Sequence, residues 1–125
     1  MKEAKTYGLT HLAITVKDID RTLRFYQHVF DMEVMYRHDN FLQLTTPGCQ
    51  DILVFEKGDE TIFGNSGSIK HFGFRLKDPK DIGYMENKVK EAGGTIIEAG
   101  EFVPGSPYVF FKDPDGYEIE IWYEI

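Results

Sequence analysis

The alternation of apolar and polar residues predicts that the first half of the chain has the order βαβββ. From Leu9 to Val16 the side chains alternate between an apolar face and a more polar face, as they do in a half-buried strand. Asp18 follows as a helix-capping residue, and apolar residues then recur at helical spacing until the helix ends near Asp31. Short apolar runs between turn residues predict three further strands, at about 33–37, 41–45 and 52–56.

The second half repeats this order of elements. Residues 69–76 alternate like a strand, and Asp78 with Pro79 then marks the start of a helix that ends at Gly93-Gly94. Strands are predicted at about 95–99, 108–112 and 118–123. The predicted fold class is α+β, with two tandem βαβββ modules in a single domain, residues 1–125. The predicted bounds are about 7–57 for module one, about 58–67 for a polar linker and about 68–125 for module two.

The two predicted modules also share a short sequence motif. Residues 10–18 match residues 70–78 in pattern, with identity at the histidine, the lysine and the aspartate. His11 and His71 therefore occupy equivalent positions on the first strand of each module. Two equivalent histidines suggest a single shared site.

Composition narrows the classes of partner. With 42% hydrophobic residues, a chain of 125 residues can bury a core of its own. A formal charge of -7 without any basic run argues against binding to nucleic acid or to an anionic membrane, which leaves small molecules as partners. The sequence shows no apolar signal region and no apolar stretch of about 20 residues, so a cytoplasmic location is the default expectation. The single cysteine, Cys49, lies in a predicted turn and can form neither an internal disulfide nor a cysteine-based zinc site.

The closing segment, residues 113–120 with the sequence Asp-Pro-Asp-Gly-Tyr-Glu-Ile-Glu, adds a more specific signal. Together with His11, His71 and the helix that contains Phe25-Tyr26, it resembles the vicinal oxygen chelate superfamily over essentially the whole chain. This superfamily includes glyoxalase I, extradiol dioxygenases, fosfomycin resistance enzymes and bleomycin resistance proteins. The resemblance implies that curled mixed sheets from two modules enclose a metal site, and that the protein forms a homodimer.

Three residues supply the side chains that a catalytic metal would need. A divalent metal that also holds a substrate needs a few protein ligands and open coordination positions, and two histidines with one carboxylate form such a set. His11, His71 and Glu120 provide these types, and the resemblance selects Glu120 over Glu118, which shares its strand face. The residue two positions after each histidine is small, alanine or glycine, and leaves room for a ligand. The expected cofactor is a divalent iron, manganese, nickel or zinc ion.

A fourth protein ligand is missing from the expected position. Aligning the last strands of the two modules puts Leu53 at the position equivalent to Glu120, where the resemblance to glyoxalase I implies Glu or Gln. Glu56 could replace it only if the strand bulges or shifts register. Three protein ligands instead resemble the extradiol dioxygenases and the fosfomycin thiol transferases, although Phe110 stands where a tyrosine is expected in both groups.

Four further residues are candidates for substrate binding. Arg75 shares the strand face of His71 and could bind a carboxylate or phosphate, or it could lie at an exposed strand end. Trp122 and Phe55 could form an apolar wall for a ring or an acyl chain, or they could pack in the core. Tyr108 follows Gly-Ser-Pro and could belong to a mobile rim.

These features predict a metal-dependent enzyme that acts on a small substrate with two adjacent oxygens. The metal would chelate those oxygens as a Lewis acid, in a lyase, isomerase or ring-cleaving dioxygenase reaction, and Glu120 is the candidate catalytic base. The alternative is a metal-free small-molecule-binding protein of the bleomycin resistance type. The pattern leaves open whether the metal ligands come from one chain or from two.

Overall fold

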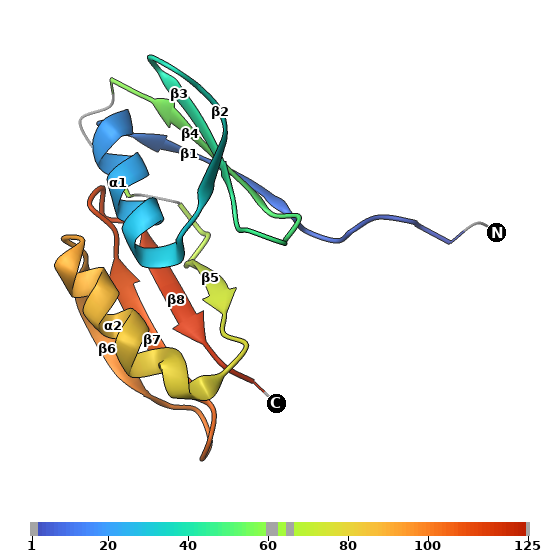
Figure 1. The fold of residues 1–125 in the computed structure, drawn as a ribbon, viewed down its shortest axis with the longest axis vertical. Coiled ribbons are helices and arrows are strands. Elements are labelled where there is room, and N and C mark those ends of the chain that lie inside the picture. Colours follow the sequence, from blue (N-terminus) through green and yellow to red (C-terminus); the bar gives the residue numbers. More distant parts are fainter. Residues whose placement is uncertain (1–2, 60–62, 65–66, 125) are drawn as a thin grey trace.

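The computed structural model describes residues 3–59, 63–64 and 67–124 and contains two units of the order βαβββ (Figure 1). The first unit consists of β1 (His11–Val16), α1 (Ile19–Phe30), β2 (Glu33–His38), β3 (Phe41–Thr45) and β4 (Ile52–Lys57). The second unit consists of β5 (Phe72–Arg75), a 3₁₀ turn (Pro79–Asp81) that continues into α2 (Ile82–Glu91), β6 (Thr95–Glu101), β7 (Pro107–Lys112) and β8 (Glu118–Trp122). Parts of the predicted linker, residues 60–62 and 65–66, lie outside the described residues.

Each unit folds its four strands into one mixed sheet. The strand order is β1-β4-β3-β2 in the first sheet and β5-β8-β7-β6 in the second. β1 pairs in parallel with β4, and β5 pairs in parallel with β8, while the other strand pairs are antiparallel. A parallel pair needs a long crossover connection, and each helix forms part of one. The described strands form two open sheets and no closed barrel, which confirms the predicted α+β class.

Local signals in the sequence set the ends of both helices. Asp18 caps α1, because its side chain accepts a hydrogen bond from the backbone N–H of Arg21 at 3.1 Å. Asp31 then ends α1 in the left-handed conformation, with a φ of 54°. Asp78 accepts a hydrogen bond from the backbone N–H of Lys80 at 2.9 Å and caps the turn that leads into α2. Within the described residues, neither helix is long and apolar enough to cross a membrane.

The two units share one hydrophobic core. Helix α1 packs against both sheets, because Tyr26 contacts Phe55 of β4 with 4.9 Å between ring centroids and Phe30 stacks on Phe74 of β5 with 3.7 Å. It also contacts α2, which lies beside it on the same side of the molecule (Figure 1). Each sheet turns one face toward this core, through Leu42, Leu44, Leu53 and Phe55 of the first sheet and Val109, Phe111, Ile119 and Ile121 of the second. The alternate residues of the same strands occupy the opposite face, which is more exposed.

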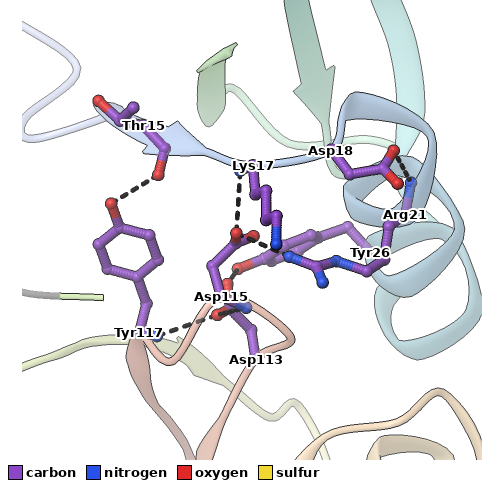
Figure 2. A network of polar contacts seen from close by, with 8 residues as sticks. All are labelled: Thr15, Lys17, Asp18, Arg21, Tyr26, Asp113, Asp115 and Tyr117. Atoms are coloured by element: carbon purple, nitrogen blue, oxygen red, sulfur yellow. Dashed lines mark hydrogen bonds and ion pairs between the residues drawn. The ribbon is translucent and has the colours of Figure 1, made fainter. Parts of the chain in front are cut away.

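The loop between β7 and β8 forms hydrogen bonds that link the second unit to the first (Figure 2). Asp115 accepts hydrogen bonds from the backbone N–H of Lys17 at 3.0 Å and from the Arg21 guanidinium at 2.8 Å. The Tyr117 hydroxyl donates a hydrogen bond to the backbone carbonyl of Thr15 at 2.6 Å. The closing sequence motif therefore has a structural role, because it ties the start of β8 to the end of β1 and the start of α1.

Asp113 is the buried centre of this loop, with 5% of its surface exposed. It accepts a hydrogen bond from the Tyr26 hydroxyl at 2.8 Å and from the backbone N–H groups of Asp115 and Tyr117, each at 3.0 Å (Figure 2). Burial raises the pKa of Asp113 to about 6, although these three hydrogen bonds favour the charged carboxylate. The junction between the two units therefore contains a carboxyl group that titrates between acid and neutral pH.

Candidate functional site

The face of the second sheet that points away from the helices is called here the open face, and strand pairing arranges its residues in rows. One row contains Gly73 of β5, Glu120 of β8, Phe110 of β7 and Glu98 of β6. The next row contains Arg75, Trp122, Tyr108 and Gly100. His71 directly precedes β5 and lies at the exposed end of the same face, two residues before Gly73. The expected site residues of the second half therefore come together on one surface.

His71 lies between two carboxylates of β8. Its Nε2 atom is 3.4 Å from a carboxylate oxygen of Glu120, and its Nδ1 atom is 3.7 Å from a carboxylate oxygen of Glu118. The Phe110 ring meets the imidazole edge to face, with 5.0 Å between ring centroids. Burial raises the pKa of Glu120, and the adjacent imidazole opposes that shift. The open face thus presents one imidazole and one partly buried carboxylate beside each other.

His11 does not join this pair. It is exposed at the start of β1, on the face of the first sheet that points away from the helices. His11 and His71 both line a pocket of about 340 Å³ between the beginnings of β1 and β5, but Glu120 is not among the residues that line it. Within the described part of the chain, no three His, Cys, Asp or Glu side chains are placed together so that they could hold a metal ion. One chain therefore brings together two of the three residues selected as metal ligands.

The position equivalent to Glu120 in the first sheet is Val54 rather than Leu53. Gly73 pairs with Glu120 in the second sheet, and Ala13, the equivalent of Gly73, pairs with Val54 in the first. Leu53 belongs to the core beneath the helices instead. The alignment that selected Leu53 was wrong by one residue, and a shift of one residue moves a side chain to the other face of a sheet. The equivalent position has no carboxylate, as the sequence predicted.

Gly73 leaves space, but a protein side chain occupies it. A Cβ atom at Gly73 would lie 2.9 Å from a ring carbon of Trp122 and 2.9 Å from the backbone oxygen of Glu120. The expectation that this glycine leaves room for a ligand therefore needs correction, because the indole of Trp122 already covers it. Trp122 lies on the open face, as predicted, and its position depends on the absence of a side chain at residue 73.

Gly73→Ala is expected to displace the Trp122 indole and to lower the free energy of unfolding by about 1–3 kcal/mol, because the added methyl overpacks β5 against β8. Trp122 is the only tryptophan, so a shift of intrinsic fluorescence reports the displacement directly. Gly83→Ala on α2 is the matched control, since a Cβ there meets nothing within 4 Å. Equal fluorescence and equal stability of the two variants would contradict the packing described for Trp122.

Two of the predicted substrate-binding residues have other contacts. Phe55 is 0% exposed and packs against Tyr26 in the shared core, with 4.9 Å between ring centroids. The prediction that it lines a substrate pocket is wrong, because strand alternation places Phe55 on the helix-covered face of β4. Arg75 lies on the open face and is exposed, and its guanidinium donates a hydrogen bond to the backbone carbonyl of Glu124 at 2.7 Å.

Tyr108 lies on the open face together with two residues that the sequence did not single out for binding. Its hydroxyl donates a hydrogen bond to Glu98 at 2.9 Å, and its ring stacks on Phe102 with 4.2 Å between centroids. A β-bulge between Ile96 and Glu98 shifts the alternation of side chains along β6. The alternation of residues in the sequence therefore does not show on which face of the sheet Glu98 lies. Phe102 belongs to the loop after β6, where no strand period applies.

Comparison with known proteins agrees with this architecture. The sequence model of the Glyoxalase/Bleomycin resistance protein/Dioxygenase superfamily matches residues 8–121, and the chain belongs to this superfamily. The chain is 28% identical over 119 residues to catechol-2,3-dioxygenase of Bacillus subtilis. The aligned region makes up 90% of this chain but only 41% of that protein. It is 25% identical over 123 residues to the metallothiol transferase FosB of Bacillus licheniformis, covering 97% of this chain and 78% of the relative.

A solved structure shows the same fold at lower sequence identity. A point mutant of the fosfomycin resistance protein FosX of Listeria monocytogenes, in complex with Mn(II) and 1S,2S-dihydroxypropylphosphonic acid, superimposes with a TM-score of 0.76 at 20% identity. The match covers 94% of this chain and 90% of FosX. The chain is thus similar in sequence to a dioxygenase and a thiol transferase, and in fold to a fosfomycin resistance protein.

Proposed function

We propose that this protein is a metal-dependent enzyme acting on a small substrate with two adjacent oxygens, at a site built from two copies of the chain. The observation that carries the proposal is the pair formed by His71 and Glu120, whose side chains lie 3.4 Å apart on the open face. In the proposed site this pair comes from one copy and His11 comes from the other. The fosfomycin resistance protein FosX, which has the same fold, has been solved with Mn(II) bound.

The chemistry of the donors fits a divalent metal of the manganese, iron, nickel or zinc kind. An imidazole nitrogen and a carboxylate oxygen both suit such ions. Glu118 lies 3.7 Å from Nδ1 of His71, on the side of the ring away from Glu120, and would orient the imidazole if Nε2 binds a metal. We therefore assign Glu118 a positioning role and Glu120 the role of ligand.

A homodimer would supply the missing histidine. A two-fold axis that brings His11 of one copy to His71 and Glu120 of the other creates two identical sites. Exposed apolar side chains on the outer strands support such an assembly, with Met35 and Tyr36 of β2 at 50% and 55% exposed and Ile97 of β6 at 46%. Association of two copies would cover these side chains.

In this site the metal would polarise the two substrate oxygens as a Lewis acid, which contributes several kcal/mol to stabilising negative charge that develops on them. The residues of the chain provide the remaining functions. Glu120 can take a proton from a carbon next to a substrate carbonyl if it releases the metal in part, as a lyase or isomerase reaction requires. Trp122 and Tyr108 line the same face and would contact the substrate. The same residues also suit a ring-cleaving dioxygenase, in which no such proton transfer from carbon is needed.

The first test is the metal content of the untagged protein, purified without chelators and measured by mass spectrometry. We expect about one manganese, iron, nickel or zinc ion per chain. Zinc, which has no redox chemistry, would favour the Lewis-acid reactions, whereas manganese or iron would be compatible with both classes. No stoichiometric metal, even after incubation with each ion, would overturn the enzyme proposal and favour a metal-free binding protein of the bleomycin resistance type.

A further inference from the structure

The residues before β1 form an arm that leaves the body of the molecule. Residues 3–10, called here the N-terminal arm, lie outside the helices and strands and extend away from both sheets (Figure 1). Two large apolar side chains of this arm, Tyr7 and Leu9, are 83% and 98% exposed. Gly8 lies between them with a φ of 89°, so it turns the chain just before the strand in a conformation that favours glycine. The arm therefore holds apolar side chains that are available to another apolar surface.

The arm starts at the mouth of an apolar pocket. Leu9 and Thr10 line one side of the pocket of about 340 Å³ between β1 and β5, and Gly73 lines the other side. The other apolar lining residues are Leu12, Ile52, Leu53, Phe72 and Phe74. The carbonyl of Thr10 accepts a hydrogen bond from the backbone N–H of Ile52 at 2.7 Å, which holds this end of the arm on the side of β1 and β4. Leu9 therefore stays at the rim of the pocket of its own chain.

The strand edges beside this pocket have no paired neighbour among the described strands, since β1 pairs only with β4 and β5 only with β8. The carbonyls of Thr10 and Val16 accept hydrogen bonds from the side of β4. Because alternate residues of a strand direct their backbone groups to the same edge, those of His11 and Ala13 point to the free edge of β1. The same reasoning places the backbone groups of Gly73 at the free edge of β5. An extended segment in the pocket can therefore add strand hydrogen bonds to its apolar contacts.

We propose that two copies of the chain exchange their N-terminal arms, so that Leu9 of each copy enters the pocket between β1 and β5 of the other. This inference rests on the two-copy site of the proposed function. Each arm starts at the mouth of the pocket that receives the other arm, so one two-fold axis generates both contacts. A foreign peptide in the pocket would leave Leu9 of the arm exposed, whereas the exchange covers both the arm and the pocket.

The exchange also brings the proposed metal ligands toward each other. His11 follows Leu9 by two residues, which is roughly 7 Å along an extended chain. Because His71 lines the pocket that receives Leu9, an inserted arm carries His11 of one copy to the partner's His71. The arm then closes one side of the proposed site to water.

The test places the photoreactive residue p-benzoylphenylalanine at position 9 of the full-length protein. Unlabelled and ¹⁵N-labelled chains are mixed in equal amounts, exchange is verified by native mass spectrometry of mixed-label dimers, and the sample is irradiated. Trypsin cleaves after Lys5, Lys17, Lys70 and Arg75, so the arm lies in peptide 6–17 and the β5 side of the pocket in peptide 71–75. We expect cross-links between these two peptides, with unlike labels in about half of them. The same residue in place of Tyr84, an exposed side chain on α2, should give no unlike-label cross-link to peptide 71–75.

The pattern of cross-links separates the exchange from other positions of the arm. Cross-links to peptide 71–75 with like labels only mean that the arm covers the pocket of its own chain. Cross-links only between two copies of peptide 6–17 mean that the two arms touch each other. Either result refutes the exchange, as does a protein without dimers or without cross-links.

The outcomes also distinguish the exchange from the proposed function. The experiment is run once with EDTA and once with Mn²⁺. Unlike-label cross-links in a protein that binds no metal support the exchange while the enzyme proposal fails. Stoichiometric metal without these cross-links refutes the exchange while the metal site stands.

A point variant provides a second measurement. Leu9→Ser should weaken the dimer at least about tenfold in analytical ultracentrifugation, because each dimer loses two buried leucine side chains. Tyr84→Ser, which removes an exposed apolar side chain from α2, should leave the dimer unchanged. Equal dimer affinities of the Leu9→Ser variant and the wild type would refute the insertion of Leu9.

Discussion

Two variants that each lose the metal site, His11→Ala and His71→Ala, are expected to regain one site when they are combined in a single dimer. Either substitution alone removes one of three ligands, which should lower metal affinity by at least about a hundredfold. In a mixed dimer, the intact His11 of the His71→Ala chain meets the intact His71 and Glu120 of the other chain. The second site of that dimer lacks both histidines. We therefore expect about one metal ion per mixed dimer and almost none in either parent variant.

The experiment requires co-expression of two differently tagged chains, purification through both tags, removal of the tags and measurement of metal by mass spectrometry. The matched control combines His71→Ala with Glu120→Ala. Both of these substitutions lie in the second half of the chain, so no arrangement of that mixed dimer contains an intact ligand set. Metal in this control, or no metal in the His11→Ala and His71→Ala combination, would refute a site shared between two copies.

The stability of the wild-type protein is expected to fall between about pH 4 and pH 7. The Asp113→Asn variant should lose most of this pH dependence. The pKa of Asp113 is raised by burial from 3.8 to about 6, so the folded state holds its proton more tightly than the unfolded chain does. A raised carboxyl pKa gives stability that is fully present below the unfolded pKa and is lost as the pH rises through the folded pKa. At 1.36 kcal/mol per pKa unit, this loss amounts to about 3 kcal/mol for the wild type.

Asparagine suits the same position without a charge. Its amide oxygen can accept the backbone hydrogen bonds of Asp115 and Tyr117, and its amide nitrogen can donate to the oxygen of the buried Tyr26 hydroxyl, although the hydroxyl hydrogen loses its acceptor. Urea unfolding of both proteins at pH 4.5 and pH 7.5 provides the measurement. We expect the difference in stability between the two pH values to be smaller in the variant than in the wild type. The exposed Asp39→Asn should follow the wild type at both pH values, and an Asp113→Asn variant that does so too would contradict the assignment.

Local interactions explain why the sequence alone predicted the elements so well. Caps such as Asp18 and Asp78 act on backbone groups two or three residues away, so their effect is visible in the order of residues. Strand alternation likewise placed His71, Glu120 and Trp122 on one face of the second sheet, where the structure finds them. The errors occurred where two faces of a strand had to be distinguished, as at Leu53 and Val54, or where a bulge changed the period, as at Glu98.

The sequence by itself determined the two βαβββ units, their helix ends and the chemical types available for a site. Only the tertiary structure decided that Phe55 belongs to the core, that Trp122 fills the space over Gly73, and that His11 shares a pocket with His71 that Glu120 does not line. The physical reason is that a period of two defines the two faces of a strand but does not state which face the helices cover. That choice depends on how α1 packs across both sheets, through contacts such as Tyr26 with Phe55 and Phe30 with Phe74, whose partners are far apart in the chain.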